Sequence, residues 1–240
     1  MRSTVFKSSV ILVLACTGTL LSQVRQVVLD GETYQVEEVF FDDFNKGLDN
    51  WQPEGDGKVR AAHGFLEVDS RFGDEGANTI WCVKSFSGPQ LVEYDVRLMG
   101  DSYHSNVNMF LMASLPNGRG ILATSDERTG DYGEYHQFPN YLITILNGIG
   151  PDKTARLRFR MRLDPGFELV EEEWHEPLVF GKIHHIAYLV RPPKISVFLD
   201  GKLLGKANYS KSLNRGLHGL RVWHTHSIYD NFRVSSITGK

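Results

Sequence analysis

Cysteine is nearly absent from this sequence. Its 240 residues contain two, Cys16 and Cys82. Cys16 lies in the N-terminal segment, so Cys82 stands alone and no disulfide framework can form. We expect Cys82, in "TIWCVKSF", to be a small buried hydrophobic residue rather than a nucleophile.

An excess of charge and the common catalytic motifs are also missing. The formal net charge of −3 gives no general attraction to nucleic acid or to an anionic membrane, so neither is an expected partner. No P-loop, no G-x-G-x-x-G in a βαβ context and no G-x-S-x-G elbow is present. These absences exclude the standard phosphate-binding and serine-hydrolase sites.

The N-terminal segment carries an apolar run that is too short for a membrane span. "VILVLACTGTLL" (10–21) follows Arg2 and Lys7, the pattern of a secretory signal. We expect a signal peptide over 1–22 and a secreted or periplasmic protein. The alternative is a lipoprotein signal that ends before Cys16 in "VLAC", with a lipid anchor on that cysteine.

Sustained helical periodicity is lacking after the signal, and short alternating runs dominate instead. Asp200-Gly201 marks a hairpin turn within 194–209. About a dozen short strands at intervals of roughly 8–12 residues predict an all-β jelly-roll sandwich of two antiparallel sheets. The other expected strands are 33–44, 64–70, 79–86, 90–100, 104–114, 141–148, 154–164, 167–174, 182–191 and 219–234.

The domain organisation is simple. We expect an N-terminal extension over 23–35 and a single sandwich domain over 36–240, present as a monomer. The section 115–140 is long and irregular, and such loops are often functional.

A row of arginines is the strongest polar signal. In "ARLRFRMRLD" (155–164) four apolar side chains share one face and four arginines share the other, by the two-residue period of a strand. Glutamates of the next strand could pair with them in a salt-bridge ladder. Alternatively the row binds an anionic polymer, since arginine matches carboxylate and sulfate. We predict that Arg158 and Arg160 bind substrate.

Two further segments offer sugar-binding groups. His104, Asn106 and Asn108 share one face of the strand over 104–114, where they suit sugar hydroxyls or are only solvated. "YGEYHQFPNY" (132–141) presents side chains that could stack on a sugar or pack the loop onto the sheet: Tyr135, His136, Gln137 and Tyr141.

"GLRVWHTHSIYDNFRV" (219–234) is expected to be one strand, with His224 and His226 on one face and Trp223 on the other. A zinc site would need further ligands that the sequence does not supply, so we expect no cofactor and no zinc, while a structural calcium ion stays open. The imidazoles are predicted to face the sugar groove.

These groups suit β-elimination on a uronic acid, in which the carboxylate is neutralised, a base removes a proton and an acid assists the leaving oxygen. The predicted catalytic residues are His104, Tyr135, His136 and His224. The predicted substrate-binding residues are Asn106, Asn108, Gln137, Tyr141, Arg158, Arg160, Trp223 and His226. Hydrolysis needs two carboxylates, and loop acids offer them: Asp126, Glu127, Asp131 and Glu134.

Several segments resemble known families. "VFFDDFNKGLDNW", "HGFLEVDS" and "VFLDGKLLG" resemble the concanavalin A-like sandwiches of carbohydrate-active proteins. "NMFLMAS", "YHQFPNYLITILNG", "ARLRFR" and the segment 219–234 resemble the YesU-type family of bacterial domains of unknown function. The resemblance spans 38–236 and implies an acidic plant or algal polysaccharide as ligand. It assigns no catalytic residue.

The predicted function is therefore a secreted polysaccharide lyase acting on acidic polysaccharide. A glycoside hydrolase of the same fold and a non-catalytic carbohydrate-binding module are the alternatives.

Overall fold

The computed structural model describes residues 24–100, 105–115 and 120–240. The expected signal segment, Cys16 and His104 lie outside these ranges. Within them, no helix has the length and apolar character needed to cross a bilayer.

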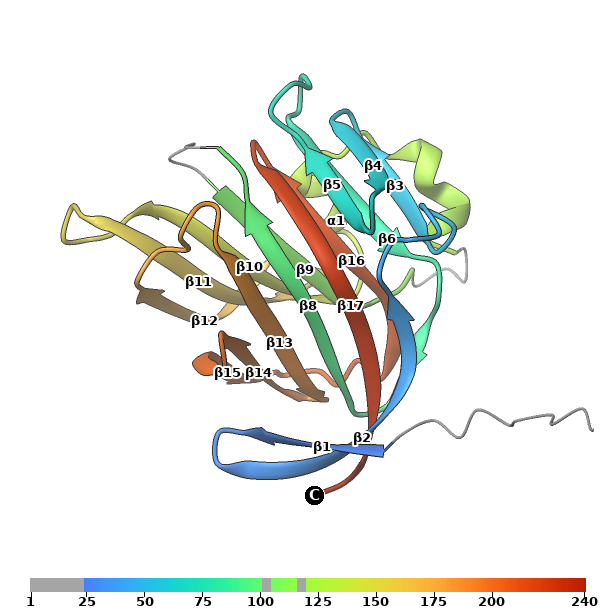
Figure 1. The fold of residues 1–240 in the computed structure, drawn as a ribbon, viewed down its shortest axis with the longest axis vertical. Coiled ribbons are helices and arrows are strands. Elements are labelled where there is room, and N and C mark those ends of the chain that lie inside the picture. Colours follow the sequence, from blue (N-terminus) through green and yellow to red (C-terminus); the bar gives the residue numbers. More distant parts are fainter. Residues whose placement is uncertain (1–23, 101–104, 116–119) are drawn as a thin grey trace, which may run out of the picture.

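The described residues form two antiparallel sheets, as the alternating runs predicted (Figure 1). Sheet A has nine strands: β1 (Val24–Leu29), β2 (Glu32–Asp42), β17 (His226–Gly239), β8 (Gln90–Leu98), β13 (Ile183–Arg191), β14 (Lys194–Leu199) and β15 (Lys202–Asn208), with β5 (Phe65–Asp69) paired to β17 and β4 (Lys58–Ala62) paired to β5. Sheet B has eight: β12 (Glu168–His175), β11 (Ala155–Asp164), β10 (Asn140–Ile149), β9 (Ser105–Ala113), β16 (Arg215–Trp223), β6 (Ala77–Cys82) and β3 (Trp51–Gly55), with β7 (Phe86–Ser87) attached to β16.

The main core lies between the two sheets. Alternation decides which side chains enter it: Val107 and Met109 of β9 are fully buried there, as are Phe159 and Met161 of β11. Cys82 is also buried in this core, as expected, and burial raises the pKa of its thiol to about 12. The intervening residues of β9 and β11 point to the outer face of sheet B.

Residues 24–35, which were predicted to be part of an N-terminal extension, belong to the hairpin of β1 and β2. Leu29, Tyr34 and Val36 pack on a second apolar cluster that includes Leu91, Leu189 and Phe198. The hairpin thereby covers apolar side chains that would otherwise be exposed, so residues 24–35 contribute to the folded structure.

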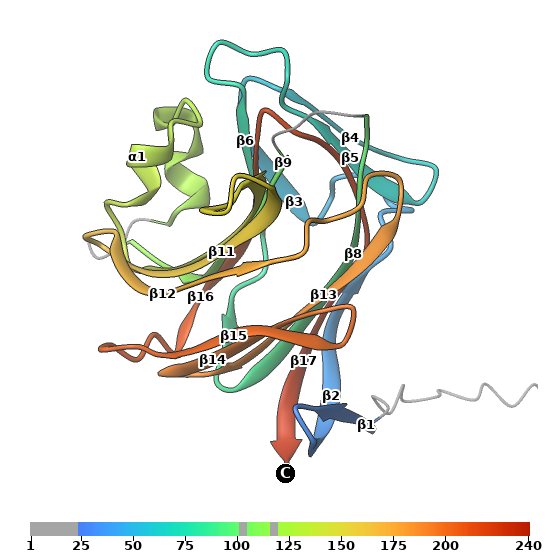
Figure 2. The same ribbon diagram turned by 90° about the vertical axis from the view of Figure 1, so that its left-hand side faces the viewer.

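The irregular section 120–140, the covering segment, contains η1 (Leu122–Glu127) and α1 (Tyr132–Tyr135). Figure 2 shows α1 against sheet B, on the side that faces away from sheet A. Ile121, Tyr135 and Phe138 pack there in a third apolar cluster whose members on the sheet are Trp81, Phe110 and Leu142. The segment therefore covers one part of the outer face of sheet B.

The prediction of a single strand over 219–234 is wrong. β16 ends at Trp223, His224 adopts a positive φ of 45°, and β17 begins at His226 in the other sheet. The His224 amide donates to the Gly76 carbonyl at 2.7 Å, which fixes this turn. His224 and His226 consequently do not share a strand face.

Candidate functional site

A row of polar residues crosses the outer face of sheet B from strand to strand. Arg221 of β16 lies opposite Asn108 of β9, which lies opposite Thr144 of β10, which lies opposite Arg160 of β11. Directly opposed residues point to the same face of a sheet. The register therefore gathers two guanidiniums, an amide and a hydroxyl from four neighbouring strands of the sheet.

A cavity of about 330 Å³ opens over this row. Tyr132 of the covering segment contributes to one wall, and its hydroxyl lies 3.5 Å from Thr144 Oγ1. The lining residues are Asn106, Asn108, Tyr132, Leu146, Arg160, Arg221 and Trp223. Four of them were predicted as substrate-binding residues: Asn106, Asn108, Arg160 and Trp223.

Arg221 is almost fully buried, with 1% of its surface exposed. It donates to Thr79 Oγ1 at 3.0 Å and to the Gly130 carbonyl at 2.9 Å. The centre of its guanidinium lies 4.9 Å from the centroids of the Tyr132 and Tyr135 rings. Among the described residues it has no carboxylate partner, and burial lowers its pKa. A buried cation without a counter-charge favours the binding of an anion.

Arg160 differs from its neighbours in the arginine row. Arg156 pairs with Asp152 and Glu176, and Arg158 pairs with Glu172 at 2.7 Å. Within the described ranges Arg160 makes no ion pair, and its buried Nε has no hydrogen-bond partner. Burial, followed by the nearby Arg158, lowers its pKa.

The salt-bridge ladder with the next strand accounts for Arg158, whose partner Glu172 belongs to β12. Arg156 instead pairs with Asp152 and Glu176, which lie outside β11 and β12. Arg160 lines the cavity. Arg162 lies over the Phe167 ring and donates to its carbonyl at 2.8 Å, so it serves the packing of that turn.

Asn106 and Asn108 are buried, and the Oδ1 atom of each has no hydrogen-bond partner. Buried polar atoms are nearly always satisfied by protein or by a bound molecule. The two amide oxygens can accept hydrogen bonds from hydroxyl groups, and the two guanidiniums without ion pairs in the described structure can donate to anionic or neutral oxygens.

Two of the predicted residues are buried away from this cavity. Tyr135 is buried beneath the covering segment, where its hydroxyl donates to Glu54 Oε2 at 2.9 Å and burial raises its pKa. Tyr141 faces the main core, and its hydroxyl donates to the Lys211 carbonyl at 2.9 Å. In this structure both rings contribute to packing.

His136 contacts Tyr132 of the cavity wall, whereas Gln137 lines a different cavity on the covering segment. The His136 ring stacks on Phe167 with a centroid separation of 3.9 Å and meets Tyr132 at 4.4 Å. Burial, assisted by the nearby guanidiniums, lowers its pKa to about 4, so the imidazole is neutral near pH 7. Gln137 is exposed and donates to the Gly133 carbonyl at 3.4 Å.

The two histidines near the C-terminus have separate environments. His224 is exposed at the cavity rim, where its ring centroid lies 4.5 Å from that of Trp223. His226 lies 2.8 Å from Glu67 Oε1 and 3.3 Å from Arg71. The prediction that both imidazoles face one groove is wrong, because the turn at His224 separates them. Within the described part of the chain, no group of three or more His, Cys, Asp or Glu residues could bind a metal.

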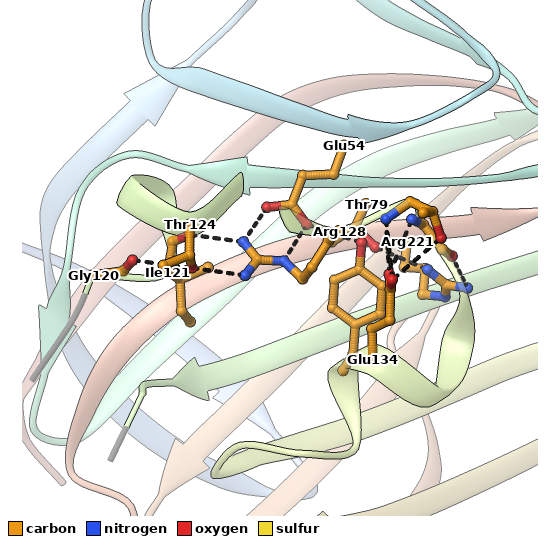
Figure 3. A network of polar contacts seen from close by, with 11 residues as sticks. Glu54, Thr79, Gly120, Ile121, Thr124, Arg128, Glu134 and Arg221 are labelled. Atoms are coloured by element: carbon orange, nitrogen blue, oxygen red, sulfur yellow. Dashed lines mark hydrogen bonds and ion pairs between the residues drawn. The ribbon is translucent and has the colours of Figure 1, made fainter. Parts of the chain in front are cut away.

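A network of buried polar contacts fixes the covering segment to sheet B (Figure 3). Arg128 donates from Nε to Glu54 Oε2 at 2.9 Å and from Nη2 to the Ile121 carbonyl at 2.7 Å. The Glu134 carboxylate accepts from the backbone amides of Thr129 and Gly130. Because Gly130 in turn accepts from Arg221, this network determines the position of the cavity guanidinium.

Sequence reasoning missed Tyr132 and Arg221. Alternation in "GLRVW" does place Arg221 on the face opposite Leu220 and Val222, so its direction was readable. Its burial was not, because the covering segment that produces it comes from a distant part of the chain.

The fold is a concanavalin A-like jelly roll, the architecture of many glucanases and carbohydrate-binding proteins. The chain belongs to the family described as domain of unknown function DUF6250, whose model matches residues 73–232. No curated protein matches the sequence. The family match does not confirm the resemblance to the YesU-type family.

Solved structures of several proteins are similar in fold. A protein of unknown function with a galectin-like fold from Bacillus subtilis is 18% identical with a TM-score of 0.73, covering 85% of this chain and 100% of its own. The carbohydrate-binding module CBM66 from Bacillus subtilis is 15% identical with a TM-score of 0.56, covering 79% and 97%. An endo-β-1,3-glucanase from Pyrococcus furiosus is 13% identical with a TM-score of 0.59, covering 90% and 99%. At these identities the likeness establishes the fold.

Proposed function

We propose that this protein is carbohydrate-active and binds an acidic sugar of a polysaccharide in the cavity on sheet B. One observation carries the proposal: Arg160 and Arg221 enter the same cavity, and neither has a carboxylate partner among the described residues. A uronate carboxylate would supply the missing charge, and the amides of Asn106 and Asn108 would bind its oxygens or the neighbouring hydroxyls. Trp223 offers an aromatic surface for a sugar ring.

The similar structures support a saccharide as the ligand class. One is a carbohydrate-binding module and another a glucanase, both of the same fold. Fold alone does not define function, so the proposed ligand is inferred from the residues that line the cavity. Export through the expected signal segment 1–22 is consistent with a polysaccharide ligand, and export, the monomeric state and the absence of a cofactor remain predictions.

The reaction we propose is β-elimination. A base removes the proton at C5, the C4–O bond breaks, a C=C bond forms, and the leaving oxygen receives a proton. Arg160, Arg221 and Asn108 would stabilise the negative charge that develops on the carboxylate. Burial raises the pKa of Tyr132, so its phenol is protonated near pH 7 and suits the acid role. His136 and His224 remain the described candidates for the base, with His104 outside the described ranges.

Hydrolysis by two carboxylates fits the site less well. Among the described residues no carboxylate lines the cavity. Glu127, Asp131 and Glu134 line a different cavity on the covering segment. Glu54 is paired with Arg128 and shielded from solvent.

Binding without catalysis is the second candidate. One observation favours it: no imidazole lines the cavity within the described ranges, and the raised pKa of Tyr132 makes its phenol a poor base. A module of this kind would bind the same acidic sugar and release no product.

Ultraviolet absorbance and calorimetry on the purified protein test these functions together. The probes are pectate, rhamnogalacturonan, alginate, glucuronan and ulvan. Binding of one polymer with a rising absorbance from the new C=C bond would establish a lyase, and binding with a flat trace would select the module. Arg160→Gln should lose binding, while the matched control Arg156→Gln should retain it, because Arg156 already has two carboxylate partners. Absence of binding to every polymer would overturn the proposal.

A further inference from the structure

The residues Arg221, Asn108, Thr144 and Arg160 form the cavity row, and a second row of side chains runs parallel to it on the outer face of sheet B. Asn106 of β9, Leu146, Arg158 and Trp174 of β12 lie directly opposite one another from strand to strand. Trp223 of β16 lies two residues from Arg221 and lines the same cavity as Asn106 and Leu146. We call these five residues the flank row. It begins in the cavity and ends at the edge strand of the sheet.

The flank row lies on the side of the cavity row that the covering segment leaves exposed. On the other side, Phe110 and Leu142 are buried beneath the covering segment. Trp223 keeps 42% of its surface exposed, and Leu146, Arg158 and Trp174 are half-buried. In the described structure a ligand longer than the cavity can therefore extend along the flank row, across the strands.

The flank row offers an aromatic surface to a saccharide beyond the cavity. The Arg158 guanidinium lies 5.4 Å from the centroid of the Trp174 ring and pairs with Glu172, so cation and aromatic ring are held next to each other. Four strand spacings separate Trp223 from Trp174, roughly 19 Å along the sheet. This length exceeds that of one sugar ring.

We propose that the cavity is one subsite of a groove for an internal stretch of acidic polysaccharide, with the Trp174 ring as a second, distal subsite. This inference rests on the proposed function and extends it from a single acidic sugar to a chain that crosses the strands of sheet B. Affinity should then increase with chain length, and Trp174 should contribute only to the longer ligands.

The test is calorimetry with fragments of the polymer that binds, among pectate, rhamnogalacturonan, alginate, glucuronan and ulvan, sized from the monosaccharide to the hexasaccharide. Trp174→Ala should weaken hexasaccharide binding by about tenfold, the change expected for loss of one aromatic contact, and leave the monosaccharide unchanged. Trp174→Tyr should retain the length dependence. The matched control is Phe41→Ala, which removes an exposed aromatic ring of sheet A.

The outcomes separate the two proposals. If no polymer or fragment binds, the proposed function fails and this inference with it. If fragments bind but the monosaccharide binds as tightly as the hexasaccharide, or if Trp174→Ala weakens all lengths equally, the distal subsite is overturned while the cavity proposal stands. If Trp174→Ala has a lower melting temperature than the wild type, the distal subsite is tested by Trp174→Tyr and by the length series of the wild type.

Discussion

The buried Arg221 side chain lines the proposed binding cavity, where its charge costs stability. Its guanidinium is removed from water and makes two hydrogen bonds to neutral acceptors, with no carboxylate partner in the described structure. Desolvating a charge costs several kcal/mol, which hydrogen bonds to neutral groups offset only in part. The fold tolerates this cost, and an anionic ligand would recover it.

Replacing this guanidinium should therefore separate stability from binding. We expect Arg221→Met to change the free energy of unfolding by no more than about 2 kcal/mol, because removing an unpaired buried charge offsets the hydrogen bonds to Thr79 and Gly130 that are lost. Binding of the acidic polymer should fall at least tenfold. Denaturant titration and calorimetry measure the two effects, and a variant that binds like the wild type would contradict the role of Arg221.

His136 gives the site a defined dependence on pH. Its folded-state pKa of about 4 lies below the ordinary value of 6.5. Between these values the unfolded chain holds a proton on this imidazole that the folded chain does not, so stability is lost as pH falls through this window. The buried His218, with a pKa of about 3, acts in the same direction, while Asp164, raised to about 6, opposes both.

His136→Phe isolates one of these contributions. A phenyl ring can keep the stacking on Phe167 and Tyr132 but cannot bind a proton. The variant should lose less stability than the wild type between pH 6.5 and 4, with a difference in slope of at most about 1.4 kcal/mol per pH unit. Denaturant titrations across this range supply the measurement. Identical slopes for the two proteins would mean that other titratable groups cause the loss of stability at low pH.

At the scale of the element, the covering segment depends on one buried ion pair. The Glu54 and Arg128 side chains are 0% and 8% exposed. Glu54→Gln keeps the shape of the side chain but leaves the guanidinium without a counter-charge. Losing one partner of a buried pair costs about 3–5 kcal/mol, so we expect a loss of this size and faster hydrogen exchange over 120–140.

The control for this prediction is Glu176→Gln, which alters a side chain that is 85% exposed. Its unfolding free energy and exchange rates should match those of the wild type, since exposed ion pairs contribute little. Unchanged exchange over 120–140 in Glu54→Gln would mean that the apolar cluster alone fixes the segment. Acidic-polymer binding should weaken together with the segment, because Gly130 orients Arg221.

The hairpin of β1 and β2 is a second element whose role can be tested by a matched pair. Val36 is fully buried against sheet A, whereas Val28 of the same hairpin is 66% exposed. A carboxylate at position 36 would be buried without a partner, so Val36→Asp should cost several kcal/mol and expose the apolar cluster to a dye such as ANS. Val28→Asp should stay within about 0.5 kcal/mol of the wild type.

Most strands were predictable because their alternation is strict. The runs that became β8, β9, β11 and β13 place apolar residues at every second position, and the structure follows them. β3 and β4 were missed because Pro53, Gly55 and Gly57 break the pattern there. The break at His224 was missed because a histidine in a left-handed conformation gives no signal in the sequence.

At the scale of the whole molecule, the site was predictable only in part. Strand alternation identified Asn106, Asn108 and Arg160, since each faces away from an apolar neighbour. The sequence could not show that the arginine row divides between ion pairs and the cavity, because this depends on which glutamate of β12 reaches which arginine. Tyr135 and Tyr141 were predicted for the site because they lie beside the irregular section, and only the three-dimensional packing shows them buried.

The overall charge sets the last expectation. The chain has a net charge of −3, so an acidic polymer is not attracted over long distances, and affinity must come from guanidiniums inside the cavity. Salt screens buried pairs much less than exposed ones. We therefore expect the dissociation constant to change less than about tenfold between roughly 0.1 M and 1 M salt, where the Debye length falls from about 10 Å to about 3 Å. Calorimetry at increasing NaCl concentrations measures this dependence. A steep loss of affinity would instead indicate binding to exposed basic residues, and such binding would survive the Arg221→Met substitution.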